Sequence, residues 1–315
     1  RASLNKMSDR TMKIIFLGTP AFAATVLDAV INSSHEVLCA VTQPDTVKGK
    51  KNVYSPLKSY CLKKGLTVYD WKNINKSGIE ALKNYNADIM VTAAYGQMLS
   101  QSVLDITKHG VINVHGSVLP LFRGASPIQS AIIEGKEETG ITIAQTALKM
   151  DSGDIIMQAT TKIEKTDTAD SLFEKLAVLG GDLLVKALNA IEGNFATFIP
   201  QNHQQATYCK KIKASDEKIE FSQPAQNVSC FIRGLSSNPG AYTFFNGKRL
   251  KIYNCFQTQT EQNLKAGQLF YTKKELIIGC GIGAISVIDL QLSESKRMKT
   301  ADFLNGLKNR PQFLG

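Results

Sequence analysis

Asn113 and His115 are the residues whose types and spacing are best suited to chemistry. They lie two apart in the apolar run Val111-Ile-Asn-Val-His115, which predicts a short buried strand. Alternate side chains of a strand leave the same face, so the amide and the imidazole would lie side by side. Such a pair suits stabilisation of a developing oxyanion and proton transfer. A strand-end Asn and His can equally satisfy backbone groups of a loop, so the pair alone does not decide between the two interpretations.

A carboxylate follows a second apolar run. Residues 140–147 predict a strand, and Met150-Asp-Ser-Gly-Asp154 then predicts a turn. Asp151 in that turn could set the protonation of a nearby imidazole or accept a proton itself. A turn carboxylate also commonly caps a backbone group or faces solvent, and both interpretations stay open at this point.

The first glycine turn, Gly18-Thr19-Pro20, is a poor match to a dinucleotide-binding loop. Such a loop needs further glycines, as in G-x-G-x-x-G, so that the backbone can approach a pyrophosphate. Pro20 and Phe22 are found nearby instead. The sequence therefore disfavours a nicotinamide cofactor.

The first half of the chain alternates strand and helix patterns. Thr19 offers a helix N-cap, and Pro20 suits the first helical position. Strands separated by helices indicate a parallel sheet with crossover helices. Asn113 and His115 would then lie at the carboxyl end of a strand, where open α/β sheets bind ligands. The predicted strands are residues 13–18, 37–42, 88–94, 111–115 and 140–147, and the predicted helices are residues 19–32, part of 53–64, 79–85 and 168–191.

The last third of the chain has a different pattern. Residues 195–207 are polar and irregular, and we predict that they form a linker. Asn246-Gly247 lies between two strand patterns and is typical of a tight hairpin turn. A run of short strands of this kind predicts a small β-barrel, and the OB type, which often binds nucleic acid, is one such barrel. The predicted strands are residues 241–245, 250–256, 267–271, 276–279 and 284–290.

The net charge of +10 is concentrated in that last third. Residues 205–315 contain 16 Lys and Arg against 8 Asp and Glu, whereas the preceding residues are nearly balanced. An excess confined to one region favours a polyanionic partner, with nucleic acid ahead of an anionic membrane surface. A surface that is basic by chance is the alternative.

Composition sets the outer limits. A chain of 315 residues with 43% hydrophobic and 20% charged residues fits a folded globular protein of about two domains. No apolar run approaches the roughly 18 residues of a membrane span. Residues 1–11 lack the apolar core of a signal peptide, so we expect the folded chain to open near Met12. The six cysteines are scattered without metal-ligand spacing, which favours a cytoplasmic protein without a metal.

Taken together, these segments resemble a known family. The run Asn113-Val-His-Gly-Ser-Val-Leu-Pro120, followed by Phe122-Arg-Gly-Ala-Ser-Pro-Ile-Gln129, resembles the signature of the folate-dependent formyltransferases. Asp151-Ser-Gly-Asp154 resembles the second active-site loop of that family. The segments 13–22, 42–45 and 94–96 are similar to the members that act on charged initiator tRNA. The chain departs from the family at Val118, commonly leucine, and over residues 45–51, which are fewer and poorer in arginine.

The resemblance implies an α/β fold in two domains. It implies a Rossmann-like formyltransferase domain with a parallel sheet over residues 12–194, the linker 195–207, and a tRNA-binding, OB-like β-barrel over residues 208–315. It also implies an enzyme that transfers the formyl group of 10-formyltetrahydrofolate to the free amino group of methionyl-tRNA for translation initiation. Neither a metal, a membrane nor an obligatory protein partner is expected.

The resemblance also implies roles for particular residues. Asn113, His115 and Asp151 are implied to be the catalytic set. In the chemistry of formyl transfer, Asn113 and His115 would hold the oxyanion of a tetrahedral intermediate. Asp151 would keep His115 in the right protonation state and help remove the ammonium proton through water. The residues implied to border the folate are Ser117, Val118, Leu119, Pro120, Tyr95 and Gly96.

A cluster of lysines follows the second predicted strand. Lys48, Lys50 and Lys51 would lie at the same edge of the sheet as Asn113 and His115. The acceptor end of a tRNA must reach Asp151, so we predict that these lysines contact its phosphates. A solvated loop is the alternative.

Three other functions compete with this one. A formyltransferase of a small amine, such as glycinamide ribonucleotide, would share the catalytic set but needs no basic barrel. A sugar-nucleotide formyltransferase carries a second domain but does not account for its positive charge. A non-catalytic nucleic-acid-binding protein would account for the charge and leave Asn113, His115 and Asp151 unexplained.

Overall fold

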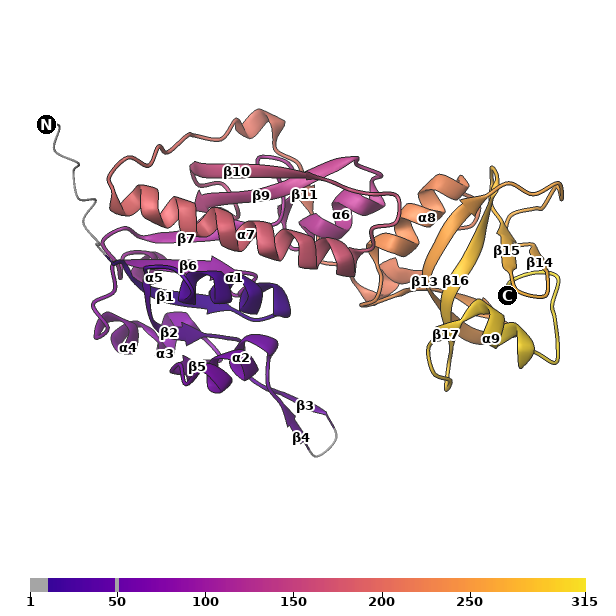
Figure 1. The fold of residues 1–315 in the computed structure, drawn as a ribbon, viewed down its shortest axis with the longest axis horizontal. Coiled ribbons are helices and arrows are strands. Elements are labelled where there is room, and N and C mark those ends of the chain that lie inside the picture. The colour runs from indigo at the N-terminus through magenta and orange to yellow at the C-terminus, as the bar shows by residue number, and fades with distance from the viewer. Residues whose placement is uncertain (1–10, 49–50) are drawn as a thin grey trace, which may run out of the picture. The chain divides into compact units, whose positions relative to one another are not determined.

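The protein is described by a computed structural model of residues 11–48 and 51–315 (Figure 1). It divides into two compact units. Unit 1 comprises most of the chain up to Arg123 together with Gly140–Thr160 and Glu174–Tyr208. Unit 2 comprises Gly124–Thr139, Thr161–Phe173 and Cys209–Gly315. Among the described residues, no helix is both long and apolar enough to cross a membrane.

A seven-stranded sheet forms the centre of the first half of the chain. Its strand order is β10-β9-β7-β6-β1-β2-β5. All the pairings from β5 to β7 are parallel, as the alternation of strands and helices predicted. The prediction is wrong for the next strand, because β9 runs antiparallel to β7. The strands are β1 (Lys13–Gly18), β2 (Glu36–Val41), β5 (Val68–Tyr69), β6 (Ile89–Ala93), β7 (Val111–His115), β9 (Glu138–Gln145) and β10 (Ile155–Lys162).

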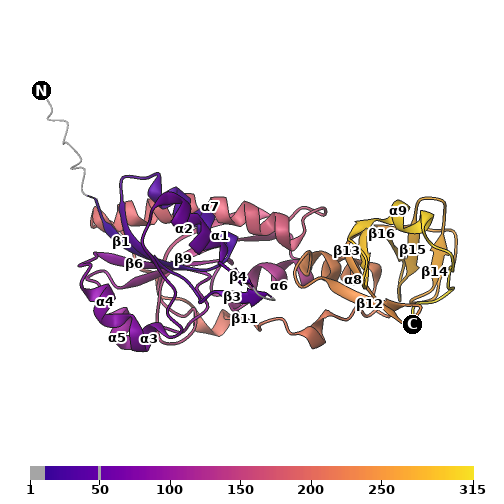
Figure 2. The same ribbon diagram turned by 90° about the horizontal axis from the view of Figure 1, so that it is seen from below.

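Helices cover both faces of this sheet. Figures 1 and 2 show α1 and α7 over one face and α3, α4 and α5 over the other. The bounds of these helices are α1 (Ala21–Ile31), α2 (Pro56–Lys64), α3 (Ile74–Ser77), α4 (Ile79–Lys83), α5 (Gln101–Leu104) and α7 (Ala169–Glu192).

The start of α1 differs from its prediction. Pro20, not Thr19, is the N-cap residue of the helix. The hydroxyl of Thr19 donates instead to the backbone carbonyl of Tyr95, 3.1 Å away. This bond ties the end of β1 to the loop after β6, and tertiary structure thus overrides the local capping preference.

Helix α7 lies close to the sheet and to α1. A Cβ atom at Gly180 would come within 3.1 Å of Val114 on β7, and one at Gly181 within 2.7 Å of Ala29 on α1. The first distance is tighter than nine in ten real Cβ contacts, and the second is shorter than real Cβ atoms approach. The glycine pair therefore lets the helix pack on both elements at once.

A short antiparallel sheet dominates unit 2. Its strands pair in the order β12-β13-β16-β15-β14, with β17 beside β16. Asn246 and Gly247 both have positive φ, as the predicted hairpin turn requires. The elements are β12 (Ala241–Phe245), β13 (Lys248–Thr258), β14 (Leu269–Tyr271), β15 (Leu276–Gly279), β16 (Ala284–Leu292), β17 (Met298–Lys299), α8 (Ala225–Gly234) and α9 (Thr300–Asn305).

The last residues of the chain join the two outer strands of this sheet. Beside β14, the N–H of Leu269 donates to the carbonyl of Gln312. Beside β12, the N–H of Gly315 donates to the carbonyl of Phe244. Unit 2 therefore contains a small closed β structure, as the sequence predicted. Its interior is largely hydrocarbon, including Leu250, Ile252, Leu276, Ile278 and Ile285.

The helices α6 (Pro127–Ile133), α8 and α9 of unit 2 were not predicted. Helix α6 packs against α8 (Ala225–Gly234), and Gly234 leaves no room for a side chain beside Ile133. This packing explains why residues 124–139 group with residues 209–315 rather than with the segments that flank them in sequence.

Candidate active site

Asn113 lies in the middle of β7 with its side-chain amide fixed in one orientation. The hydroxyl of Thr92 on the neighbouring strand β6 donates to Asn113 Oδ1, 2.8 Å away. Thr92 and Asn113 are partners in the parallel register of the two strands. The bond occupies the amide oxygen and turns the Nδ2 donor toward Asp151 Oδ1, at 3.4 Å. Asn113 therefore presents a hydrogen-bond donor to the site.

His115 lies at the end of β7 and is only 5% exposed. Its Nε2 atom is 2.9 Å from the backbone carbonyl oxygen of Phe122. A carbonyl can only accept, so the hydrogen of this bond is on Nε2. The other nitrogen, Nδ1, faces Asp151 Oδ1 at 3.7 Å, beyond the range of a direct hydrogen bond. Nδ1 is therefore the nitrogen that can exchange a proton with a bound group.

Asp151 joins these two side chains from a loop. The loop follows β9 and is held at its ends, because the N–H of Gln145 donates to the carbonyl of Asp154. Asp151 has a φ of +50°, a left-handed conformation that non-glycine residues adopt at some energetic cost. The structure thus brings Asn113, His115 and Asp151 together within unit 1.

The predicted folate-binding run after β7 is folded mostly inward. Ser117 is fully buried, and its hydroxyl donates to the carbonyl of Leu121. The N–H of Leu119 donates to the hydroxyl of Thr142, which itself donates to the carbonyl of Ser117. Val118 and Pro120 are half-buried. Only these two retain side-chain surface for a ligand, and contact of the run with folate stays a prediction.

The structure gives Tyr95 a different position from the one expected of a pocket-lining ring. Its side chain is 3% exposed and packs in a hydrophobic cluster with Leu99 and Val103. Its backbone carbonyl accepts hydrogen bonds from Thr19 and Gln43. Gly96 is exposed, with a φ of +89°. A ligand could therefore meet this loop at its backbone but not at the tyrosine ring.

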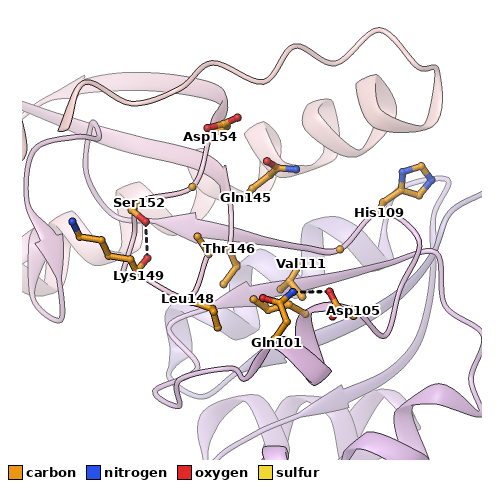
Figure 3. Close-up of a pocket in the computed structure, with 14 residues that line it drawn as sticks. Gln101, Asp105, His109, Val111, Gln145, Thr146, Leu148, Lys149, Ser152 and Asp154 are labelled. Atoms are coloured by element: carbon orange, nitrogen blue, oxygen red, sulfur yellow. Dashed lines mark hydrogen bonds between the residues drawn. The ribbon is translucent and has the colours of Figure 1, made fainter.

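A cavity of about 660 Å³ adjoins the loop that carries Asp151 (Figure 3). It begins beside Val111, which shares a face of β7 with Asn113 and His115. Its lining combines apolar side chains with polar groups and backbone of the loop. None of the six residues predicted to border folate lines it. The lining includes Gln101, Leu104, Val111, Thr146, Leu148 and Gly153.

Two of the lysines predicted to contact tRNA, Lys48 and Lys51, belong to two short strands that follow β2. These strands are β3 (Thr46–Lys48) and β4 (Lys51–Val53), which pair antiparallel. Lys50 and the side chains of Lys48 and Lys51 lie outside the described residues. Their role stays a prediction.

The cysteines are not candidates for nucleophilic catalysis. All six are buried and none forms a disulfide, and burial raises the pKa of Cys39 and Cys255 to about 12. A thiol with so high a pKa is almost entirely protonated at neutral pH. Among the described residues, no cluster of three or more His, Cys, Asp or Glu could hold a metal ion.

Sequence reasoning missed several polar residues that hold the site. Thr92 was included only in an apolar strand, and Thr142 and Gln158 were not singled out. Gln158 Nε2 donates to Leu119 O and Thr142 Oγ1, at 2.8 and 2.9 Å. Gln201, within the predicted linker, is buried and contacts Arg123. A lone polar residue in an apolar strand, such as Thr92, is the signal that could have found one of them.

Comparison with known proteins agrees with this site. The family model described as formyl transferase matches residues 12–188, and that of the formyl transferase C-terminal domain matches residues 211–308. A methionyl-tRNA formyltransferase from Agathobacter rectalis is 39% identical over 299 residues, which cover 94% of this chain and 96% of that protein.

Two solved structures share the fold at low sequence identity. HypX from Aquifex aeolicus, in complex with tetrahydrofolic acid, is 17% identical with a TM-score of 0.69. The match covers 97% of this chain but only 51% of HypX, so the chain spans about half the length of that protein. The sugar 3N-formyl transferase WlaRD is 18% identical with a TM-score of 0.66, over 91% of this chain and 100% of WlaRD.

The two family models together span both regions of the chain, and the catalytic-type side chains converge within the first. Both observations lead to one assignment. The chain belongs to the formyl transferase family.

Proposed function

We propose that this chain transfers the formyl group of 10-formyltetrahydrofolate to the amino group of methionyl-tRNA. The observation that carries the proposal is the convergence of Asn113, His115 and Asp151 in unit 1. The choice of methionyl-tRNA rests on the 39% identical relative of that name, which matches 94% of this chain. The basic last third of the sequence supports a nucleic-acid substrate.

The cavity beside Val111 is not assigned to the folate. Its lining is largely polar and includes Asp105, His109 and Lys149, and it contains neither a catalytic candidate nor a residue expected to border folate. We place the folate at the loop after β7 instead, where Val118 and Pro120 retain side-chain surface close in sequence to His115.

The formyl donor supplies a carbonyl carbon that is already activated, so the chain must position the amine and stabilise charge. When the amine attacks, negative charge develops on the formyl oxygen. Asn113 Nδ2 is a preorganised donor for that oxygen, because Thr92 holds the amide in place. A proton on His115 Nδ1 gives a second donor. Donors fixed in advance stabilise the transition state without reorganising.

Asp151 would accept a proton from the attacking nitrogen. Its carboxylate oxygen Oδ1 faces His115 Nδ1 at 3.7 Å. The attacking nitrogen arrives as an ammonium ion, which must lose a proton before it can act as a nucleophile. Asp151 can accept that proton through a water molecule, since the carboxylate is partly exposed. The nitrogen that has attacked carries one proton more than the amide product. That proton passes to the folate nitrogen as the bond between this nitrogen and the formyl carbon breaks, and the proton on Asp151 is released to water.

A formylation assay tests the proposal. The purified protein should formylate methionyl-tRNA when 10-formyltetrahydrofolate is present and should leave it unmodified without the donor. A nucleotide-linked amino sugar, the kind of substrate that WlaRD's name describes, serves as the competing acceptor. Formylation of the sugar in preference to the tRNA would overturn the choice of acceptor and leave the formyl-transfer chemistry intact. The cytoplasmic location, the absence of a metal and the absence of a protein partner stay predictions.

A further inference from the structure

Gln201 lies far from the catalytic residues in sequence yet contacts their loop directly. It is 6% exposed in the segment that follows α7. Its Nε2 atom donates to the backbone carbonyls of Asp151 and Gly153, at 3.0 and 2.7 Å. These two carbonyls flank Ser152. The side-chain amide therefore holds the turn on both sides of one residue.

The oxygen of the same amide is also fully used. Gln201 Oε1 accepts from Arg123 Nε at 3.1 Å and from Arg123 Nη2 at 2.6 Å. An amide offers two hydrogens and an oxygen with two lone pairs, so these four bonds occupy its whole capacity. Turning the amide over would set its oxygen against two carbonyls and its hydrogens against a cation. Its orientation is therefore fixed.

Arg123 is itself fixed in place by burial and by a further contact. Its side chain is fully buried, and Nη2 also lies 2.9 Å from His203 Nδ1. A buried guanidinium next to Oε1 polarises the amide and strengthens the bonds that Nε2 donates. Arg123 therefore acts on the Asp151 turn through Gln201.

The turn needs such support because its own geometry is unfavourable. Asp151 adopts a φ of +50°, a left-handed conformation that is less favourable for a residue with a side chain. Gly153 packs so closely on the carbonyl of Gln145 that a Cβ atom could not fit. Strained residues of this kind persist only where their surroundings fix them. The conformation that aims the Asp151 carboxylate at Asn113 and His115 thus depends on contacts outside the turn.

We propose that Gln201, oriented by Arg123, is a positioning residue for formyl transfer. It holds the backbone of the turn from Asp151 to Gly153 so that the carboxylate of Asp151 meets His115 and Asn113. The expected kinetic effect rests on the proposed function. The contacts of Gln201 with the backbone of the turn do not depend on that function. Gln201 touches neither substrate nor reacting atoms in this role.

Gln201→Glu separates this role from a merely structural one. Glutamate keeps the length of the side chain and both acceptor contacts with Arg123, and it adds an ion pair. It replaces the two donated hydrogens by an oxygen that faces two carbonyls. We expect thermal unfolding to stay close to that of the wild type while kcat falls by about 10- to 100-fold, the effect of a slightly misplaced catalytic group. KM for methionyl-tRNA should change less than threefold.

Two further variants complete the design. Gln201→Asn keeps the amide but shortens its reach, and it should lower kcat by about tenfold. If the glutamate variant does not fold, this variant tests the positioning role of Gln201. Gln204→Glu makes the same change of charge at an exposed position of the neighbouring short helix (His203–Gln205) and should behave as the wild type.

Hydrogen exchange gives a readout that does not depend on activity. Backbone amides of residues 152–155 should exchange faster in Gln201→Glu than in the wild type, because the turn opens more often. A wild type inactive on methionyl-tRNA would refute the proposed function, while exchange would still test the contact. A glutamate variant with kcat within twofold of wild type and unchanged exchange would overturn the positioning role. A raised KM with unchanged kcat would overturn it as well.

Discussion

The two sheets of the molecule use polar side chains differently. In unit 1, Thr92, His115, Arg123 and Thr142 are buried around one site and take part in hydrogen bonds. In unit 2, residues inside the sheet are largely apolar, and of its cations Arg233 is buried whereas Arg249 is exposed. Arg249 there stacks 3.6 Å above the ring of Tyr242.

This difference fits the separate roles that we propose for the two regions, catalysis in unit 1 and binding of a polyanion in unit 2. Fixed dipoles shielded from water stabilise a transition state, because they need no reorganisation when charge develops. Cations in water bind a polyanion by releasing its counterions, an effect that depends on salt. Changes in unit 1 should therefore alter kcat, and changes to exposed cations should alter KM and its dependence on salt.

The largest effect is expected at the catalytic set. Asp151→Asn or His115→Ala should lower kcat by about 10²-fold or more, since each removes proton transfer or oxyanion stabilisation. KM for tRNA should change little, because neither side chain is expected to bind the tRNA body. Steady-state kinetics with methionyl-tRNA measure both quantities. Near-normal turnover of either variant would remove that residue from the catalytic set.

A smaller loss is expected when the support of Asn113 is removed. Thr92→Val keeps the shape of the side chain but deletes the hydroxyl that donates to Asn113 Oδ1. The amide can then turn over and present its oxygen to the oxyanion, so kcat should fall by about tenfold. Thr160→Val, at an exposed position on β10, is the matched control. Equal kcat values for the two variants would show that the orientation of Asn113 needs no help from Thr92.

The sequence was sufficient to predict features that depend on local pattern. The period of two along Val111–His115 predicted that Asn113 and His115 share a face of one strand. The pair Asn246-Gly247 predicted a hairpin turn because its backbone needs positive φ at both residues. The assignment of Asp151 to the site came from the family resemblance, since a carboxylate in a turn has no distinctive local pattern.

Features that depend on tertiary contacts could not be predicted in this way. The partnership of Thr92 with Asn113 depends on the register between two strands. Gln201 lies 50 residues from Asp151 in sequence and in a segment whose composition suggested a linker. The antiparallel direction of β9 depends on the turn that precedes it, and the ring of Tyr95 is buried by neighbours that no local pattern names.

Lys48, Lys50 and Lys51 give a third test, which asks whether exposed cations affect KM for tRNA and not kcat. The triple variant Lys48→Ala, Lys50→Ala, Lys51→Ala should raise KM for tRNA several-fold and leave folate binding and kcat unchanged. Each lost phosphate contact should make the slope of log affinity against log salt shallower by roughly 0.7 to 0.9. Affinity measured over a salt series checks this. A wild-type slope would mean that these lysines do not touch the substrate.

The smallest effect is expected on the outer face of the hairpin β12–β13. Phe244 and Tyr242 pair in register with Arg249 and Lys251. The aromatic rings meet edge to face, with centroids 5.7 Å apart, and Phe244 is 39% exposed. Cations beside exposed rings are suited to phosphates and unpaired bases. Contact of this face with the tRNA body would explain why positive charge gathers in this third of the sequence.

The double variant Arg249→Ala, Lys251→Ala tests that contact. Loss of up to two phosphate contacts should raise KM for tRNA about two- to fivefold and flatten the salt slope by at most about 1.8. Arg249 is exposed, whereas Lys251 is half-buried and its Nζ donates to the carbonyl of Pro239. Neither belongs to the apolar interior, so the barrel should still fold, which circular dichroism can check. Lys108→Ala, an exposed cation of unit 1, is the control and should keep the wild-type KM. If the double variant also keeps it, the charge of the barrel acts through another face. A fall in kcat at unchanged KM would contradict the division of roles between the two units, because cations of unit 2 would then act on the chemical step.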